Sequence, residues 1–580
     1  MKKYLFYFII VIFGVGLYPL FSAEASQEFY VNSEYEPTGN TLEEAVNLTS
    51  STRAQFFVEK DYYDKLSEKD KDIFLTKTAE LGVVFDSEIY FKIKSLFGDE
   101  WMPGIDNDSR ITVYITDMKS EINGYFREID EYDYFKYSNS NQREMVYINA
   151  KYVIRDTASA ILAHEFQHLI MFNQKKRLRV LDEEEWLNEA MSEYAITFSG
   201  QDKSDYLKNA VKNFLAVPTD ALGIWEETAN DRASVSLFIH YLAEQYGENV
   251  IRDILQASFV GEKAINYALQ KNGFDKNFSD VFRDWTIALF LNSSLPFSNA
   301  QPVQPGCTGS TCATRLHIYK FQHPDLRYSS FHIVPQLTYS VSETGINAGF
   351  AVRDLAPEWH RFLPSKYDQE NPRVLRIDFS SRNDYYFRIP VVITYLSGKI
   401  DILETKIKNG KGFVEIPDFN VNVSSVVIIP ASHTKLSDFS QRDPLWTFSY
   451  SVSLVRLVQP GRAIGATWLH QNGDLIRIEN RPEVYIVKNT YRRHLQDSKF
   501  FNFYGHLKWE NVKIVLEDII KNYKESKLIK KAGDYKVYEV IGFRQFRWLD
   551  MTVEEFEESG RKWEAVYEVN NAEWSWYQEI

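Results

Sequence analysis

The sequence is poor in cysteine, proline and glycine, and positive charge does not predominate. Its 580 residues include 2 Cys, 18 Pro and 26 Gly, too few for a collagen-like or low-complexity chain. Two cysteines also cannot build a four-thiolate zinc site. Lys and Arg total 66 against 80 Asp and Glu, which gives a formal net charge of −14. An acidic chain lacks the general attraction to phosphate that nucleic-acid binders use, so nucleic acid is not an expected partner.

Beyond its first residues the chain has no hydrophobic run long enough to span a membrane. Residues 1–25 contain two lysines, an apolar run from Tyr4 to Leu17 and the small-x-small pattern AEA. We interpret this segment as a secretory signal peptide cut after Ala25. An uncleaved anchor is the alternative, although the run is short for a full span. The sequence therefore predicts a secreted or extracellular bacterial protein with no transmembrane anchor in the mature chain, and periplasmic or surface retention stays open.

The rest of the chain is apolar enough for several folded domains. Apolar residues make up 44% and charged residues 25%, which excludes wholesale disorder. At about 100–200 residues per domain, the length corresponds to roughly three or four domains. After the signal peptide we predict an extended leader at 26–53, an α+β domain at 54–295, a linker at 296–314, an antiparallel β-sandwich domain at 315–460, and a C-terminal α+β region of two small αβ repeat modules at 461–580.

The predicted domain boundaries rest on changes in composition and in hydrophobic periodicity. The linker concentrates Ser, Pro, Gly and Cys, and its Cys307 and Cys312 are predicted to close a small disulfide loop, with two free thiols as the alternative. Beyond it, segments such as YYFRIPVVITYL alternate as strands do. Near the C-terminus, Leu475-Ile476 and Val484-Tyr485 recur at the same spacing as Leu528-Ile529 and Val537-Tyr538. Two copies of one module explain this recurrence, and chance similarity in an aromatic-rich tail is the alternative.

Two histidines on one face of a helix predict a metal site. Residues 157–173 read TASAILAHEFQHLIMFN, a strongly apolar helical pattern. His164 and His168 lie four residues apart, so both imidazoles can point at a single ion. Glu165 is displaced around the helix, where its carboxylate can reach a water beside the ion without itself binding the ion. Two histidines and a glutamate are costly to bury unused, although two hydrogen-bonded core histidines are the alternative.

A second helix is predicted to bring a carboxylate to the same place. Residues 183–199 read EEEWLNEAMSEYAITFS, with Asp182 as the predicted cap and Gly200 as the predicted end. The gap after the first helix contains a basic run at 175–179, which we predict to be a loop that reverses the chain. The second helix would then return antiparallel to the first.

Glu189 is the predicted third ligand. It follows His168 after a gap that is long enough for the chain to reverse, and Glu193 lies four residues further along the same face. Two histidines and one glutamate leave the fourth position of a tetrahedral zinc ion open for water, which is typical of catalytic sites. Glu193 is predicted to accept the spare N–H of a ligating imidazole. For both glutamates, a solvated acidic helix face is the alternative.

The segments around these residues resemble a known family. HEFQHLIMFNQ and WLNEAMSEYA, preceded by GIDNDSRITVYITD and NQREMVYIN, resemble the bacterial hyicolysin-type peptidases among the gluzincin metallopeptidases, whose site is HExxH…E. The resemblance covers roughly residues 100–295 and is sharpest over 161–198. It implies a zincin fold, with the sheet before His164 and a helical lobe after Glu193.

The resemblance also implies a role for each residue of the motif. It makes Glu165 the general base, makes Glu193 the supporting acid, and makes zinc ligands of His164, His168 and Glu189. No downstream segment matches the one that supplies a transition-state histidine in thermolysin. By residue type alone, the candidates for that role are Tyr194, His240 and Tyr241, and core packing is the alternative for each.

These observations predict a zinc metalloendopeptidase that binds one catalytic zinc ion and acts on protein or peptide substrates. No GxSxG, GxxxxGK[ST] or strand-linked GxGxxG motif offers a rival chemistry. A surface adhesin with an inactive peptidase-like domain, or a zinc amidase acting on cell-wall peptides, are the alternatives. The C-terminal modules are expected to bind a surface or a glycan. The DNDS segment at 106–109 lacks the full calcium-loop spacing, so we predict an ordinary turn there.

Overall fold

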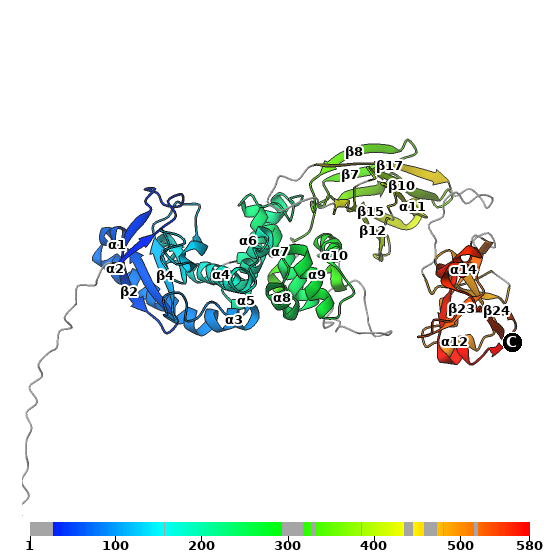
Figure 1. Cartoon of the computed structure of the whole chain (residues 1–580). Coiled ribbons are helices and arrows are strands. Elements are labelled where there is room, and N and C mark those ends of the chain that lie inside the picture. The colour runs from blue at the N-terminus through cyan, green and yellow to red at the C-terminus, as the bar shows by residue number, and fades with distance from the viewer. Residues whose placement is uncertain are drawn as a thin grey trace, which may run out of the picture.

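The computed structural model describes residues 27–155, 157–203, 205–292, 317–327, 331–383, 385–405, 407–433, 445–456, 472–478, 481–515, 520–521 and 523–580. The predicted signal peptide and the predicted Cys307–Cys312 loop lie outside these residues. Within the described ranges, no helix is long and apolar enough to cross a membrane. Along the chain, a mixed α/β region is followed by a helical segment and then by several β-sheets (Figure 1).

The N-terminal region is built on a six-stranded mixed sheet with the order β1-β2-β3-β4-β6-β5. Strands β3, β4 and β6 run parallel, and β5 pairs antiparallel with β6 at one edge. Every residue of β4 and β6 is buried, as expected for central strands covered on both faces. The strands are β1 (Gln27–Tyr30), β2 (Leu42–Ser50), β3 (Ala54–Glu59), β4 (Ile111–Thr116), β5 (Gly124–Phe126) and β6 (Met145–Asn149).

The segment predicted as a leader contributes two strands to this sheet. Strand β1 pairs antiparallel with β2, and β2 pairs antiparallel with β3. Phe29 and Ala45 from these strands are buried. The pattern was hidden because β2 also buries Glu43, whose carboxylate accepts a 3.0 Å hydrogen bond from Tyr114. A buried glutamate breaks the apolar alternation by which a strand is recognised.

Helices cover the sheet and continue into a helical lobe that shares its hydrophobic core. Helix α4 packs against β5, β6 and α5, which sets the position of the HExxH motif. The helices of this region are α1 (Lys60–Lys65), α2 (Glu68–Val84), the π-helical η1 (Phe85–Ile89), α3 (Tyr90–Phe97), α4 (Ala158–Met171), α5 (Glu185–Ser199), α6 (Tyr206–Ala216), α7 (Ala229–Tyr246), α8 (Glu248–Gln256), α9 (Gly261–Lys271) and α10 (Phe278–Leu291).

The basic run after α4 is not the predicted loop. It forms a further turn of helix, the π-helical η4 (Phe172–Arg177), and Lys175 within it is 1% exposed. The Lys175 ammonium lies 3.0 Å from the Glu183 carboxylate and donates a 2.6 Å hydrogen bond to the Phe259 carbonyl. Lysine is buried only when it is paired, and the sequence alone did not reveal this partner.

Two sheets packed face to face around a shared core follow the helices. Their orders are β14-β10-β17-β8 and β13-β12-β15-β9-β7, with β11 and β16 forming a separate pair. All pairs are antiparallel except β7 with β9. An Arg388–Asp280 ion pair at 2.8 Å joins these sheets to the helical lobe. The elements are β7 (Leu337–Val341), β8 (Ile346–Val352), β9 (His360–Pro364), β10 (Arg373–Ser381), β11 (Phe387–Arg388), β12 (Pro390–Tyr395), β13 (Ile400–Glu404), β14 (Lys411–Ile416), α11 (Phe419–Asn422), β15 (Val423–Ile428), β16 (Ala431–Ser432) and β17 (Trp446–Arg456).

The C-terminal part contains two five-stranded sheets with the same plan, β21-β18-β19-β20-β22 and β26-β23-β24-β25-β27. In each, three antiparallel strands are flanked by two strands that run parallel to their neighbours. Leu475 and Leu528, which the sequence recurrence relates, begin equivalent strands. The elements are β18 (Leu475–Ile478), β19 (Val484–Lys488), β20 (Tyr491–Leu495), α12 (Phe500–Phe503), β21 (Val512–Val515), β22 (Lys524–Glu525), β23 (Leu528–Lys531), β24 (Tyr538–Gly542), β25 (Gln545–Trp548), α14 (Val553–Glu558), β26 (Tyr567–Val569), α15 (Asn571–Trp574) and β27 (Gln578–Glu579).

Candidate metal centre

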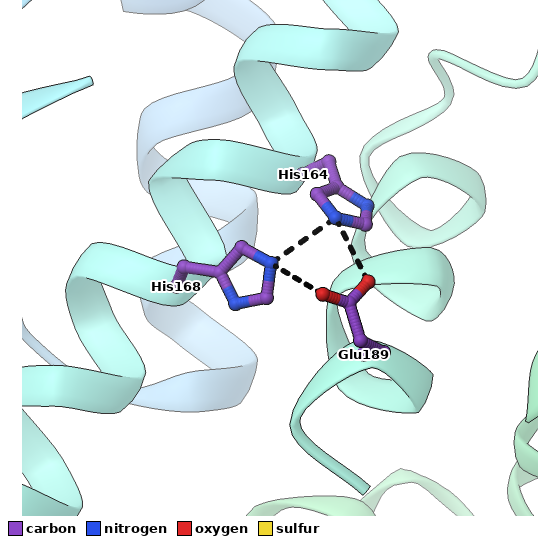
Figure 2. A group of neighbouring side chains, drawn as sticks. All are labelled: His164, His168 and Glu189. Carbon is purple, nitrogen blue, oxygen red and sulfur yellow. Dashed lines mark hydrogen bonds and ion pairs between the residues drawn. The ribbon is translucent and has the colours of Figure 1, made fainter. Parts of the chain in front are cut away.

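Helix α4 presents both histidines of the HExxH motif on one side. His164 and His168 are one turn apart, and their rings meet edge to face with centroids 4.8 Å apart. His164 is buried, and the side chain of His168 is 11% exposed. Figure 2 shows the two imidazoles projecting from consecutive turns of the helix toward the same point.

Helix α5 brings Glu189 to that point. It begins at Glu185, three residues after the predicted Asp182 cap, because Glu184 holds the extended N-cap conformation. It ends at Gly200, which takes a left-handed conformation with φ of 80°. Helix α5 packs directly on α4, and the Glu189 carboxylate points at the two imidazoles (Figure 2).

The distances between the three side chains match the edges of a tetrahedral metal site. The two histidine Nε2 atoms are 3.1 Å apart, and the Glu189 oxygens lie 3.3 Å from His164 Nε2 and 3.5 Å from His168 Nε2. Ligands at about 2.0–2.1 Å from a four-coordinate zinc ion are about 3.3 Å from one another. The three residues therefore form a buried group that could hold one metal ion.

Asn188 fixes the orientation of one imidazole. Its side-chain oxygen lies 3.1 Å from His168 Nδ1, and an amide oxygen can only accept a hydrogen bond. In the neutral imidazole of His168, the proton is thereby assigned to Nδ1, which leaves the Nε2 lone pair directed at Glu189 and His164. Ser192 Oγ also lies 3.2 Å from the same Nδ1 and donates to Gln167. Such contacts to the far nitrogen of a ligating histidine set its tautomer.

Glu193 lies behind His164 rather than in the ligand group. Its oxygen is 3.7 Å from His164 Nδ1, longer than a hydrogen bond of about 3.2 Å. The Tyr206 hydroxyl donates a hydrogen bond to the other Glu193 oxygen. Arg232 from α7 approaches both acids, with its Nη1 3.3 Å from Glu189 and 4.0 Å from Glu193. One arginine and one tyrosine therefore hold the two carboxylates of α5 in place.

The ionisable groups of the site are strongly perturbed. Burial raises the pKa of Glu165 to about 7 and that of Glu193 to about 8. Burial opposes the charge on His168, but the Glu189 carboxylate outweighs it and raises the pKa of His168 to about 9. Burial lowers the pKa of His164 to about 4, whereas the histidines hold the pKa of Glu189 well below its usual range despite burial. Near neutral pH, Glu189 is therefore the charged acid that faces the imidazoles, whereas Glu165 and Glu193 are poised to take up a proton.

Glu165 faces the edge strand β5. A Cβ built on Gly124 would lie 3.1 Å from the Glu165 carboxylate, 2.6 Å from Ile161 and 2.7 Å from the Tyr147 carbonyl oxygen. Only a residue without a side chain fits between β5 and α4 at this position. The carboxylate of Glu165 thus lies against the edge of the sheet, outside the group of three ligand residues.

The residues considered for transition-state stabilisation pack elsewhere. His240 bonds to Ser236 and to Thr197 through its two nitrogens, and the Tyr194 ring packs against it at 5.2 Å. The Tyr241 hydroxyl donates to the Ile318 carbonyl. All three have structural partners that account for them.

The DNDS segment forms a turn. Asp106 accepts a 2.8 Å hydrogen bond from the Asp108 backbone, and Asp108 binds the Arg110 guanidinium at 2.7 Å and the Gln55 amide at 2.6 Å. Both of these bonds go to Asp108 Oδ2, and Oδ1 accepts from the backbone N–H and the Nε–H of Arg110. The bond to the Arg110 side chain lowers the pKa of Asp108.

Two residues of the site had not been anticipated from the sequence. Asn188 directly precedes Glu189, so its place beside a ligand was a usable signal. Arg232 lies 43 residues after Glu189 and reaches the site only because α7 packs on α5. No spacing rule connects it to the motif.

Comparison with known proteins supplies no family. No protein-family model matches the chain, and no curated protein matches it. Among solved structures, a family GH115 4-O-methyl-alpha-glucuronidase with specificity for decorated arabinogalactans matches 61% of this chain and 53% of its own, at 8% identity and a TM-score of 0.13. The chain thus spans about half the length of that enzyme, and similarity at this TM-score carries no argument about fold or function.

Proposed function

We propose that the chain is an exported zinc-dependent endopeptidase with a zincin-type catalytic domain at 54–295. The observation that carries the proposal is the buried His164, His168 and Glu189 group, whose ligand atoms lie 3.1–3.5 Å apart. Glu165 follows the first of these residues directly in the chain. The signal-like residues 1–25 support export.

The three ligand residues would hold the ion and leave one side of it open. Bound there, zinc would supply Lewis-acid chemistry by polarising the scissile carbonyl and lowering the pKa of a water to about 7. Asn188 keeps His168 in the tautomer that offers Nε2 to the ion. Arg232 balances the Glu189 carboxylate and limits its movement.

Glu165 moves the proton during hydrolysis. It accepts a proton from the water as the water oxygen bonds to the carbonyl carbon. It then gives that proton to the leaving nitrogen as the carbon–nitrogen bond breaks. A pKa raised to about 7 by burial suits both steps, because the same group must accept and release a proton near neutral pH.

The edge strand β5 supports a peptide as the substrate. Its outer side has no neighbouring strand among the described residues, so an extended peptide could pair with it through backbone hydrogen bonds. A peptide in that position would pass over Gly124 and bring its bonds to Glu165. The backbone of the enzyme would then bind the backbone of the substrate.

Replacement of the base tests the proposal. Glu165→Gln is expected to keep its zinc and to lose activity on casein by about 10²–10⁴-fold. Glu80→Gln, the same change at the exposed end of a Lys77 ion pair, is the matched control and should retain full activity. Phenanthroline should stop the reaction, and serine-directed reagents should not.

Three results would overturn the proposal. Casein digestion by Glu165→Gln at the wild-type rate would show that Glu165 is not the general base. Hydrolysis of peptidoglycan fragments without casein digestion would make the protein an amidase. Absence of both activities in zinc-loaded wild-type protein would leave the adhesin interpretation.

A further inference from the structure

The C-terminal sheets carry the same exposed tripeptide at equivalent positions. Lys-Trp-Glu occurs at 508–510 and again at 562–564. Both copies begin a short 3₁₀ helix, η7 (Trp509–Asn511) or η8 (Trp563–Ala565). The register of the strand that follows agrees as well. Ile476 of β18 pairs with Lys513 of β21, and the equivalent Ile529 of β23 pairs with Tyr567 of β26.

The two tryptophans share one feature, a phenylalanine stacked on one face of the indole ring, while the Trp563 Nε1–H also donates a 3.1 Å hydrogen bond to Glu557. Trp509 is 56% exposed and stacks on Phe501 with centroids 4.2 Å apart and planes 9° apart. Trp563 is 42% exposed and stacks on Phe556 with centroids 4.4 Å apart and planes 30° apart. In each copy a buried phenylalanine supports one face of the indole ring. The exposed part of the ring can therefore receive a flat apolar surface from solvent.

Core packing does not explain why this tripeptide recurs. The other residues shared by the copies, such as Leu475 and Leu528, are buried and fill the core. The exposed equivalent positions Ile514 and Glu568, by contrast, have diverged. Single exposed aromatic residues are ordinary. An exposed Lys-Trp-Glu kept whole in two diverged copies calls for a ligand.

We propose that the two tripeptides are equivalent binding platforms for a neutral β-linked polysaccharide, one platform in each module. The flat face of an equatorially linked sugar ring presents C–H groups to an aromatic face, while its hydroxyls point outward. The flanking lysine and glutamate can donate to and accept from those hydroxyls. Their opposite charges cancel, so the platform has no preference for a charged polymer.

The proposal predicts a binding stoichiometry. A tetrasaccharide is short enough to occupy a single platform, so the full-length protein should bind two molecules of chitotetraose or cellotetraose. Trp509→Ala and Trp563→Ala should each bind one, and the double variant none. Glu165→Gln should bind two, because this site is independent of the proposed catalytic centre.

Trp548→Ala is the matched control. Trp548 is 39% exposed on β25 under Lys536, and the equivalent position of the first module is His494. This variant should still bind two tetrasaccharides in calorimetric titration. Equal loss of binding in Trp548→Ala and in the platform variants would overturn the proposal, because general aromatic exposure would then explain the binding.

Hydrogen exchange on wild-type protein tests the platforms without mutation. Saturating tetrasaccharide should slow exchange in residues 506–512 and 560–566 and leave exchange in β3, β4 and β6 of the N-terminal sheet unchanged. Absence of binding to either oligosaccharide would overturn the proposal. So would protection of both segments by a proline-rich peptide and not by sugar, since the platforms would then be peptide sites.

Discussion

Gly124→Ala is expected to damage catalysis while leaving the metal in place. The added Cβ would lie 2.6 Å from Ile161 Cγ2 and 2.7 Å from the Tyr147 carbonyl oxygen. An ordinary carbon–carbon contact needs about 3.5 Å, so β5 and α4 must separate by about 0.9 Å. Glu165 sits on α4 with its carboxylate 3.1 Å from the same Cβ, so it moves with the helix or turns away.

The displacement fixes the expected size of the effect. A misplacement of about 1 Å in a catalytic group costs about 10²-fold in rate, or about 2.7 kcal/mol of activation free energy. Overpacking between a strand and a helix destabilises the fold by about 1–3 kcal/mol. We therefore expect kcat/KM on a fluorogenic peptide to fall about 10²-fold, with bound zinc unchanged and a lower urea midpoint of unfolding.

Gly349→Ala is the matched control. Gly349 also lies within a strand, β8, but the nearest atom to its Cβ would be the Phe448 carbonyl oxygen at 3.9 Å. This variant should keep full activity and an unchanged or slightly higher midpoint. If Gly124→Ala kept wild-type kcat/KM, the account of Glu165 positioned against β5 would be wrong.

Three further perturbations follow from the same contacts. Asn188→Ala removes the group that holds the His168 tautomer, and we expect zinc affinity to fall about 10–100-fold in competition with a chelator, whereas unchanged affinity would contradict the tautomer assignment. The pKa of His168 is raised to about 9, so below that pH zinc must displace a proton from the ring. The logarithm of the zinc association constant should therefore rise by at least one per pH unit between about pH 6.5 and 8.5 and then level off. A zinc affinity that does not change with pH would contradict this protonation of His168. Lys175→Met leaves the 2% exposed Glu183 carboxylate without its cation and should lower the free energy of unfolding in urea by about 3–5 kcal/mol. A loss below about 1 kcal/mol would contradict the importance of this ion pair.

The metal group was predictable because local rules determine it. Two histidines four residues apart must share a helical face, and His164 and His168 do so in α4. The place of Glu189 was predictable because the gap after His168 allows a second helix to return alongside the first. The recurrence of Leu475-Ile476 as Leu528-Ile529 falls at the start of β18 and β23, which occupy the same place in their two sheets.

The missed features depend on tertiary partners. Strand β2 buries Glu43 next to Tyr114, so its sequence does not alternate cleanly. Lys175 looked like part of a solvated loop because Glu183, which pairs with it, follows eight residues later without any periodic signal. Arg232 reaches Glu189 through the packing of α7 on α5, which no local pattern encodes.

X-ray absorption at the zinc edge of the purified protein, together with elemental analysis, tests the central claim most directly. The account predicts one zinc per chain, bound by two imidazole nitrogens and by oxygen at about 2.0–2.1 Å, with no sulfur ligand. It also predicts that Glu189→Ala releases the zinc on dialysis. A zinc-free protein, a sulfur ligand, or full zinc retention in Glu189→Ala would contradict it.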